Sequence, residues 1–208
     1  MRRHFFTGMF YASSLTRLSF VKEQTYRSLI NMLIDDVSIE SLPIKFSAVA
    51  VDILKGRVVS IDRGNLREAI MASSAIPGVL PAVQRDGMML VDGSLIDTVP
   101  VRYARQLGAD IVIAVDVASQ LDIIDRPTRG IDLIWRANEI LRHIVKEEQL
   151  MGADIVIRPD LDGLEWTDFS KYRELISQGV RAAELQMDRL SDLMKTKEQG
   201  GLYAVDRQ

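Results

Sequence analysis

Residues 88–117 read MMLVDGSLIDTVPVRYARQLGADIVIAVDV, and this stretch decides the fold class. The apolar run 88–91 predicts a short buried strand that ends at Asp92. A helix is predicted over 101–107, with a proline before it and a glycine after it. The run 110–117 is almost wholly apolar, as in a parallel strand that is covered on both faces. Strand, helix and strand in this order predict a βαβ unit and a parallel sheet.

The same alternation continues on both sides of this stretch. Further helices are predicted at 23–35, from 65 to no later than 76, at 131–150 and from 170 onwards, and further strands at 46–53, 58–61 and 152–159. The apolar face of the helix at 131–150, which carries Ile134, Leu141, Ile144 and Val145, is expected to pack on the core. The chain is therefore predicted to form one α/β domain with a mostly parallel sheet, followed from 195 by a loose, charged, Gly-rich tail.

Composition excludes several classes of protein. The 208 residues contain no cysteine, so disulfides, Cys-ligated zinc and a thiol nucleophile are ruled out. The 26 basic and 29 acidic residues give no basic footprint, and no nucleic-acid partner is expected. No run of 18 apolar residues predicts a membrane-spanning helix, and residues 1–14 lack the unbroken apolar core of a signal peptide. A soluble, cytoplasmic protein is expected.

Asp92 is the first candidate for chemistry. It follows a strand and precedes Gly93, and ligands gather at the carboxyl ends of strands in open α/β sheets. From spacing alone, an Asp that caps its own Asp-Gly turn is the more frequent arrangement. Asp52, Asp97 and Asp116 are likewise expected to cap neighbouring amides, and their spacing supports no metal site.

Common catalytic signatures are missing. Neither His4 nor His143 has a serine partner at a strand-to-helix turn, so the sequence does not support a Ser-His-Asp triad. The chain contains no Gly-x-Ser-x-Gly, Gly-x-Gly-x-x-Gly or P-loop pattern. The serines in Ser73–Gly78 lack the framing glycines of a nucleophile elbow, and close packing at a helix exit is expected there. No cofactor and no metal are predicted.

Three blocks in fixed order nevertheless resemble the second half of a patatin-like phospholipase, especially of the bacterial branch. They are Ala72–Val83 (ASSAIPGVLPAV), Val91–Val101 (VDGSLIDTVPV) and Leu107–Asp116 (LGADIVIAVD). The likeness covers most of the chain, from about residue 13 to about residue 183. It implies a three-layer α/β/α fold, with residues 1–194 as a partial domain that lacks amino-terminal strands and 195–208 as the tail.

The resemblance also implies a chemistry. Members of this family are serine acyl hydrolases of lipid esters that use a Ser-Asp dyad, which explains why no catalytic histidine is found. The family's Asp-Gly-Gly or Asp-Gly-Ala block corresponds to Asp92-Gly93-Ser94, which makes Asp92 the dyad's acid and base and Gly93 part of its turn. The Gly-rich oxyanion loop and the elbow serine have no counterpart here. Gly8–Ser13 resembles the helix behind the elbow, so the sequence is expected to begin inside the nucleophile helix.

Three readings follow. In the first, the chain is a fragment of a lipid acyl hydrolase that retains the acid but not the nucleophile, so its own activity stays open. In the second, it binds lipid or a partner without catalysis. A nucleotide-binding module is a distant third, because fold class alone does not imply function. Expected partners are a lipid or fatty-acyl ester, transient contact with a membrane surface, and a second copy through an open sheet edge.

Overall fold

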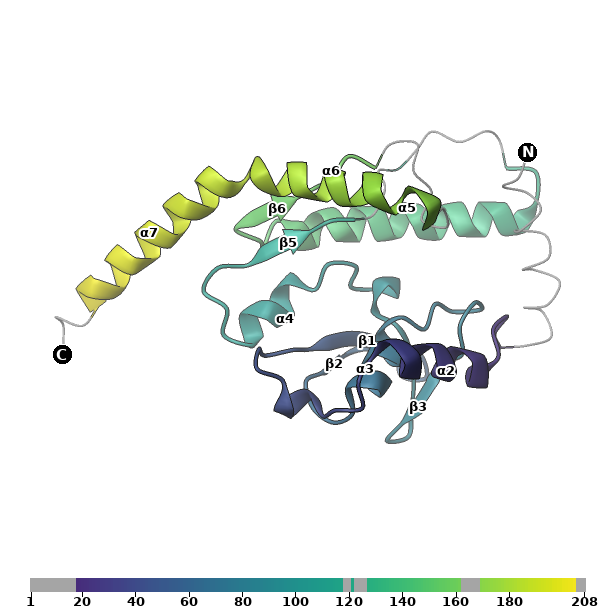
Figure 1. Cartoon of the computed structure of the whole chain (residues 1–208). Helices are drawn as coiled ribbons and strands as arrows, with labels where there is room; N and C mark the ends of the chain where they lie inside the picture. The colour runs from purple at the N-terminus through teal and green to yellow at the C-terminus, as the bar shows by residue number, and fades with distance from the viewer. Residues whose placement is uncertain (1–17, 118–120, 122–126, 162–168, 205–208) are drawn as a thin grey trace. The chain divides into compact units, whose positions relative to one another are not determined.

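The computed structural model describes residues 18–117, 121, 127–161 and 169–204, and Figure 1 traces them. The Gly8–Ser13 match, His4 and the last four residues of the predicted tail lie outside these ranges. The described chain forms two compact units, which meet in the sequence between Thr98 and Val99.

The first unit has a four-stranded sheet with helices. Its elements are α2 (Glu23–Leu33), a 3-10 helix (Ile39–Ser41), β1 (Ala48–Asp52), β2 (Arg57–Ile61), α3 (Leu66–Ser73), β3 (Val83–Arg85), β4 (Met88–Asp92) and a second 3-10 helix (Gly93–Leu95). The strand order is β2-β1-β4-β3. Helix α3 begins where predicted, because the Asn65 side chain accepts a hydrogen bond from the backbone N–H of Glu68 at 3.2 Å.

The core of this unit lies between the sheet and its helices. Tyr26 and Ile30 of α2, Met71 of α3 and Ala50 and Leu90 of the central strands are buried together. Burial of an apolar side chain of this size contributes roughly 1.5–3 kcal/mol relative to leaving it in water. The central strands β1 and β4 are thereby held against two helices: α2, which precedes β1 in the sequence, and α3, which follows β2.

The prediction of a mixed α/β architecture is confirmed, but the four-stranded sheet is not parallel. All three pairings, β1 with β2, β1 with β4 and β3 with β4, are antiparallel. For two of these pairings the reason is local: β1–β2 and β3–β4 are hairpins with tight turns, and only antiparallel strands can be joined in that way. At the second turn Asp86 and Gly87 both have positive φ, 49° and 73°, as a two-residue hairpin turn requires. The edges of this sheet are β2 and β3, and self-association through an open edge stays a prediction.

The second unit contains the parallel pairing. Its elements are α4 (Val101–Gln106), β5 (Ile113–Val115), α5 (Gly130–Leu150), β6 (Ile155–Ile157), a 3-10 helix (Phe169–Lys171), α6 (Tyr172–Glu184) and α7 (Met187–Ala204). Strand β5 pairs in parallel with β6, with Ile113 opposite Ile155, and α5 lies between them in the sequence. Of the predicted strand–helix–strand units, β5-α5-β6 is thus a parallel βαβ unit, whereas β4 and β5 belong to different sheets.

An identical hexapeptide, GADIVI, leads into both strands of this pair, at 108–113 and 152–157. The two copies are not equivalent. Asp154 of the second copy accepts a hydrogen bond from Val112 N–H at 2.7 Å and another from the Arg105 guanidinium. The Val112 N–H first, and then Arg105, hold the pKa of Asp154 below its usual value. Asp154 thus links the start of β6 by hydrogen bonds to the residue before β5 and to α4.

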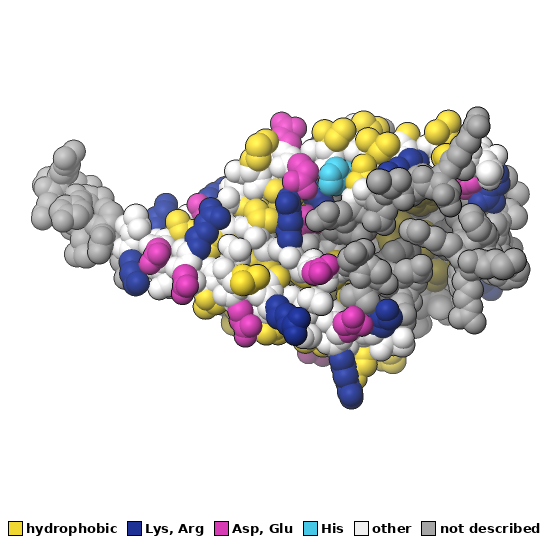
Figure 2. Space-filling model, turned by 90° about the horizontal axis from the view of Figure 1, so that it is seen from above, with side chains coloured by type: hydrophobic (Ala, Val, Ile, Leu, Met, Phe, Trp, Pro, Cys, Tyr) yellow, Lys and Arg dark blue, Asp and Glu magenta, His cyan; other side chains and the backbone are white. Residues whose placement is uncertain are grey.

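Several apolar residues predicted to be buried here are exposed. On α5, Ile134, Leu141 and Ile144 are each about three-fifths exposed, and β5 shows Ile113 and Val115 to solvent with only Ala114 buried between them. Figure 2 shows hydrophobic side chains among charged ones on one face of the molecule. The described residues of this unit therefore cover one face of β5, that of Ala114, and leave Ile113 and Val115 exposed.

Two further expectations concern the carboxyl-terminal part. The predicted helix from 170 is broken into α6 and α7 at Leu185 and Gln186, and α7 crosses residue 194, where the loose tail was expected to begin. The division of the chain at 194 stays a prediction. In the part of the chain that the structure describes, no helix is long and apolar enough to cross a membrane.

Candidate active site around Asp92

Asp92 is held at a fixed point by its neighbours. It ends β4, lies opposite Ala50 of β1, and donates its backbone N–H to the carbonyl oxygen of Ala75 at 2.9 Å. Its Oδ1 accepts a hydrogen bond from Ser94 N–H at 2.8 Å and so caps the following 3-10 helix. The expected local cap therefore exists, but it uses one oxygen. Within the described ranges the other oxygen, Oδ2, accepts no hydrogen bond, and the carboxylate is half-buried.

Gly93 is required by close approach rather than by backbone conformation. It is buried, and a Cβ atom at this position would collide with the carbonyl oxygen and carbon of Val49 in β1. Both obstacles belong to the backbone, so neither can rotate away. The turn that carries Asp92 can therefore lie against β1 only with glycine at position 93. The sequence has glycine there, directly after Asp92.

Gly93→Ala is expected to lower the free energy of unfolding by about 2–3 kcal/mol, because the added methyl group must push the turn away from β1. Gly87→Ala is the matched control in the same unit: a Cβ there meets nothing, and only the positive φ opposes it, at a cost of about 1 kcal/mol. Urea unfolding followed by far-ultraviolet circular dichroism measures both. Equal losses in the two variants would contradict the close-approach argument.

Two hydroxyl groups that the sequence did not single out as a pair lie near Asp92. The Tyr26 hydroxyl is 2.5 Å from Ser74 Oγ, and Tyr26 is almost fully buried. Burial raises the pKa of Tyr26, the Ser74 hydrogen bond opposes this, and the charge of Asp92 raises it further. Tyr26 lies in the helix predicted at 23–35, and no residue pattern marks its hydroxyl as a neighbour of Asp92.

The other acidic candidates have structural contacts. Asp52 is fully buried, and its Oδ1 accepts from Leu54 N–H at 3.3 Å, which is the local cap that was expected. Its Oδ2 lies 3.4 Å from Arg57 Nε across the β1–β2 hairpin. Asp97 is buried, and its backbone N–H donates to the carbonyl oxygen of Gly93 at 2.8 Å. Among the described residues, no group of three or more His, Cys, Asp or Glu side chains is arranged to hold a metal ion.

Asp116 in the second unit forms ion pairs. Lys146 Nζ of α5 lies 2.9 Å from Asp116 Oδ2, and both side chains are more than nine-tenths buried. Arg158 Nε approaches the same oxygen at 3.3 Å, and Arg158 Nη2 lies 2.6 Å from Glu147 Oε2. Two cations and two carboxylates balance in charge, and they tie α5 to the carboxyl ends of β5 and β6.

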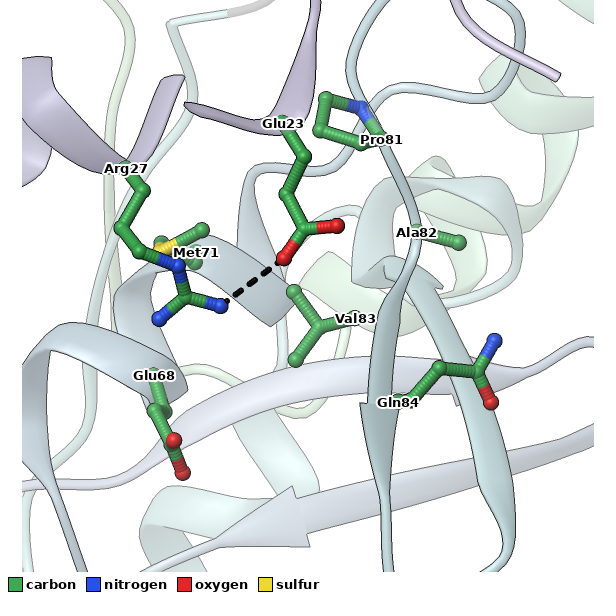
Figure 3. Close-up of a pocket in the computed structure, with 8 residues that line it drawn as sticks. All are labelled: Glu23, Arg27, Glu68, Met71, Pro81, Ala82, Val83 and Gln84. Carbon is green, nitrogen blue, oxygen red and sulfur yellow. Dashed lines mark hydrogen bonds and ion pairs between the residues drawn. The ribbon is translucent and has the colours of Figure 1, made fainter. Parts of the chain in front are cut away.

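The first unit has a pocket whose lining residues do not include Asp92. It is bordered by Glu23 and Arg27 of α2, Glu68 and Met71 of α3, and residues 81–84. Figure 3 shows the Glu23 carboxylate facing the Arg27 guanidinium, 3.0 Å away. The free volume is about 90 Å³, against the roughly 300–1,000 Å³ typical of small-molecule sites. A fatty-acyl chain does not fit in it.

Comparison with known proteins extends these observations. Residues 4–105, which include Asp92, Gly93 and the whole four-stranded sheet, match the family described as patatin-like phospholipase. This part of the chain belongs to the patatin-like phospholipase family. An NTE family protein of Mycobacterium tuberculosis is 36% identical over 104 residues, which cover 50% of this chain and 29% of that protein.

Mammalian relatives match a longer part of the chain. Patatin-like phospholipase domain-containing protein 7 of Mus musculus is 26% identical over 190 residues, 78% of this chain and 14% of that protein. Patatin-like phospholipase domain-containing protein 6 of Homo sapiens is 29% identical over 180 residues, 73% of this chain and 13% of that protein. The chain thus spans less than a third of the length of each of these relatives. At the level of the family, a patatin-like phospholipase domain indicates a lipid-hydrolase type of function.

Proposed function

We propose that the chain carries the proton-transfer half of a serine lipid acyl hydrolase, with Asp92 as the acid and base of a Ser-Asp dyad. The observation that supports this most directly is the position of Asp92. Its backbone is fixed by Ala75 and by the Gly93 turn, and its carboxylate keeps one oxygen that accepts no hydrogen bond from the described residues. A general base needs a fixed position and a free lone pair within reach of the proton that it removes.

The chemistry assigned to Asp92 has two halves. When the serine oxygen attacks the ester carbonyl carbon, the Asp92 carboxylate takes the hydroxyl proton, and it returns that proton to the alcohol oxygen as the carbon–oxygen bond breaks. Water then attacks the acyl-enzyme, and Asp92 takes a proton from the water and gives it back to the serine oxygen. A fatty acid and free enzyme result, with no external oxidant, reductant or cofactor.

The nucleophile is proposed to lie outside these 208 residues. No Gly-x-Ser-x-Gly occurs in them, and the matched relatives are more than three times longer than their aligned parts. The coding sequence directly upstream is therefore expected to encode a Gly-rich loop followed by Gly-x-Ser-x-Gly in frame. A stop codon and unrelated sequence at that place would contradict the proposal.

Enzymology gives the corresponding test. A protein extended to include the upstream coding sequence is expected to hydrolyse a short-chain p-nitrophenyl ester and to be labelled by a fluorophosphonate probe at the elbow serine. The 208-residue chain alone is expected to show neither reaction, because it lacks that serine.

The absence of an elbow serine also favours a second candidate, a non-catalytic protein that binds lipid or a partner through the same fold. Vesicle binding by an extended protein that neither hydrolyses the ester nor reacts with the probe would support this alternative and reject the dyad.

A further inference from the structure

The Tyr26 phenol is a polar group inside the core of the first unit. Only 4% of the residue is exposed, and it packs among Ile30, Met71 and Leu90. A buried tyrosine hydroxyl usually finds a hydrogen-bond partner, and here it lies 2.5 Å from Ser74 Oγ and 3.3 Å from the carbonyl oxygen of Met71. Tyr26 therefore joins α2 to the end of α3.

The direction of these hydrogen bonds follows from proton counting. Ser74 Oγ lies 2.5 Å from the carbonyl oxygen of Ile70, which can only accept, so the single Ser74 hydroxyl hydrogen is used there. While Tyr26 is neutral, Ser74 Oγ accepts from the Tyr26 O–H, whose single hydrogen is shared with the carbonyl oxygen of Met71 at 3.3 Å; once Tyr26 ionises, the Ser74 hydroxyl can donate to the phenolate instead. In the neutral state Tyr26 is thus the donor, and its hydrogen bond fixes the first residue after α3.

The next residue connects this pair to the candidate catalytic group. Ala75 is fully buried, and its carbonyl oxygen accepts the backbone N–H of Asp92 at 2.9 Å. A continuous path thus runs from Tyr26 through Ser74 and Ala75 to Asp92. Among the described residues, the charge that acts on the Tyr26 phenol is that of Asp92. Glu23, Arg27 and Glu68, on the two helices that carry the path, line the separate small pocket.

We propose that Tyr26 and Ser74 are positioning residues for Asp92. Their hydroxyl pair fixes the helix exit at Ser74 and Ala75, which in turn fixes the backbone of Asp92. The proposal rests on the proposed function, because the position of Asp92 has a catalytic meaning only if Asp92 transfers the proton.

The coupling between Tyr26 and Asp92 can be measured in the 208-residue chain without any activity. The five tyrosines are labelled with ¹³C in the ring and titrated by NMR, and Tyr26→Phe identifies the Tyr26 signal. We expect Tyr26 to titrate above the ordinary pKa of about 10, and Asp92→Asn to lower its pKa, because the negative neighbour is then gone. Asp86→Asn, an exposed carboxylate of the same unit, should leave the titration unchanged.

Kinetics of the extended protein supply the second readout. Tyr26→Phe and Ser74→Ala are each expected to lower kcat about tenfold with little change in KM, and the double variant should lose no more than the larger single loss, since both act through one path. Ser74→Thr, which keeps the hydroxyl, should retain most of kcat.

The two proposals fail in different ways. If Asp92→Asn leaves the Tyr26 titration unchanged, or if the kcat losses of the two single variants multiply, the positioning role is overturned. If the Tyr26 titration responds to Asp92 but the extended protein hydrolyses no ester, the proposed function fails while the geometry stands.

Discussion

Asp92→Asn is expected to lower the kcat of the extended protein by about 10²–10⁴-fold, which is the range of general acid–base catalysis. An amide cannot take up the serine proton, but its oxygen can still accept the Ser94 N–H that Asp92 Oδ1 accepts now. The turn should therefore keep its shape. The free energy of unfolding, measured with urea, should change by less than about 1 kcal/mol.

Asp86→Asn is the matched control for this experiment. Asp86 lies in the β3–β4 turn at positive φ, where asparagine is as well tolerated as aspartate, and its side chain is 79% exposed. The Asp86→Asn variant should hydrolyse the ester at the same rate as the parent protein. Full activity in Asp92→Asn would remove Asp92 from the mechanism, whereas a loss of activity accompanied by a large loss of stability would assign Asp92 to the fold.

The buried ion pair of the second unit leads to the other large effect. Asp116→Asn is expected to lower the free energy of unfolding by about 3–5 kcal/mol, because the buried Lys146 ammonium loses its buried carboxylate partner and keeps only the partly exposed Glu147 at 4.0 Å. Lys146→Met should cost less, since Asp116 retains Arg158 at 3.3 Å. The double variant should cost less than the sum of the two, as the uncompensated charge is then gone.

Both tryptophans lie after Val99, so their fluorescence during urea unfolding reports on the second unit. Glu139→Gln is the matched control on α5. It breaks an ion pair with Arg136 at 2.9 Å in which Glu139 is about half exposed, and it should change stability by less than about 0.5 kcal/mol. Additive losses in the Asp116 and Lys146 variants would contradict a coupled buried pair.

Elements that depend on local signals were predictable from the sequence. The strand at 88–91, the helix opened by Asn65 and the strand–helix–strand run from 110 to 159 all appear near their predicted places. Each depends on a cap, a turn or a period that neighbouring residues carry. The Asp92-Gly93 turn was found in the same way, together with the resemblance.

Strand partners were not predictable in this way. Alternating helices and strands suggested parallel pairing, but β1 lies between β2 and β4, and its pairing with β4 joins residues about 40 positions apart. The Asp86-Gly87 dipeptide was the one available signal for the β3–β4 hairpin. The helical period of the sequence identified the apolar face of α5, but it did not indicate whether other residues bury that face.

The Tyr26–Ser74 contact was beyond reach for the same reason. Its two residues are 48 positions apart, and each has an ordinary local explanation, a helix face and a helix exit. Only the three-dimensional structure places the two hydroxyl groups together beside Asp92.

The close approach of Gly93 to Val49 has a consequence for how the sheet selects its alignment. A shift of β4 by one residue along β1 would turn Asp92 to the opposite face of the sheet. In the observed register the residue against the Val49 carbonyl must be glycine, because a Cβ atom at position 93 would collide there. The candidate acid therefore occupies its present place only when β4 pairs with β1 in this register.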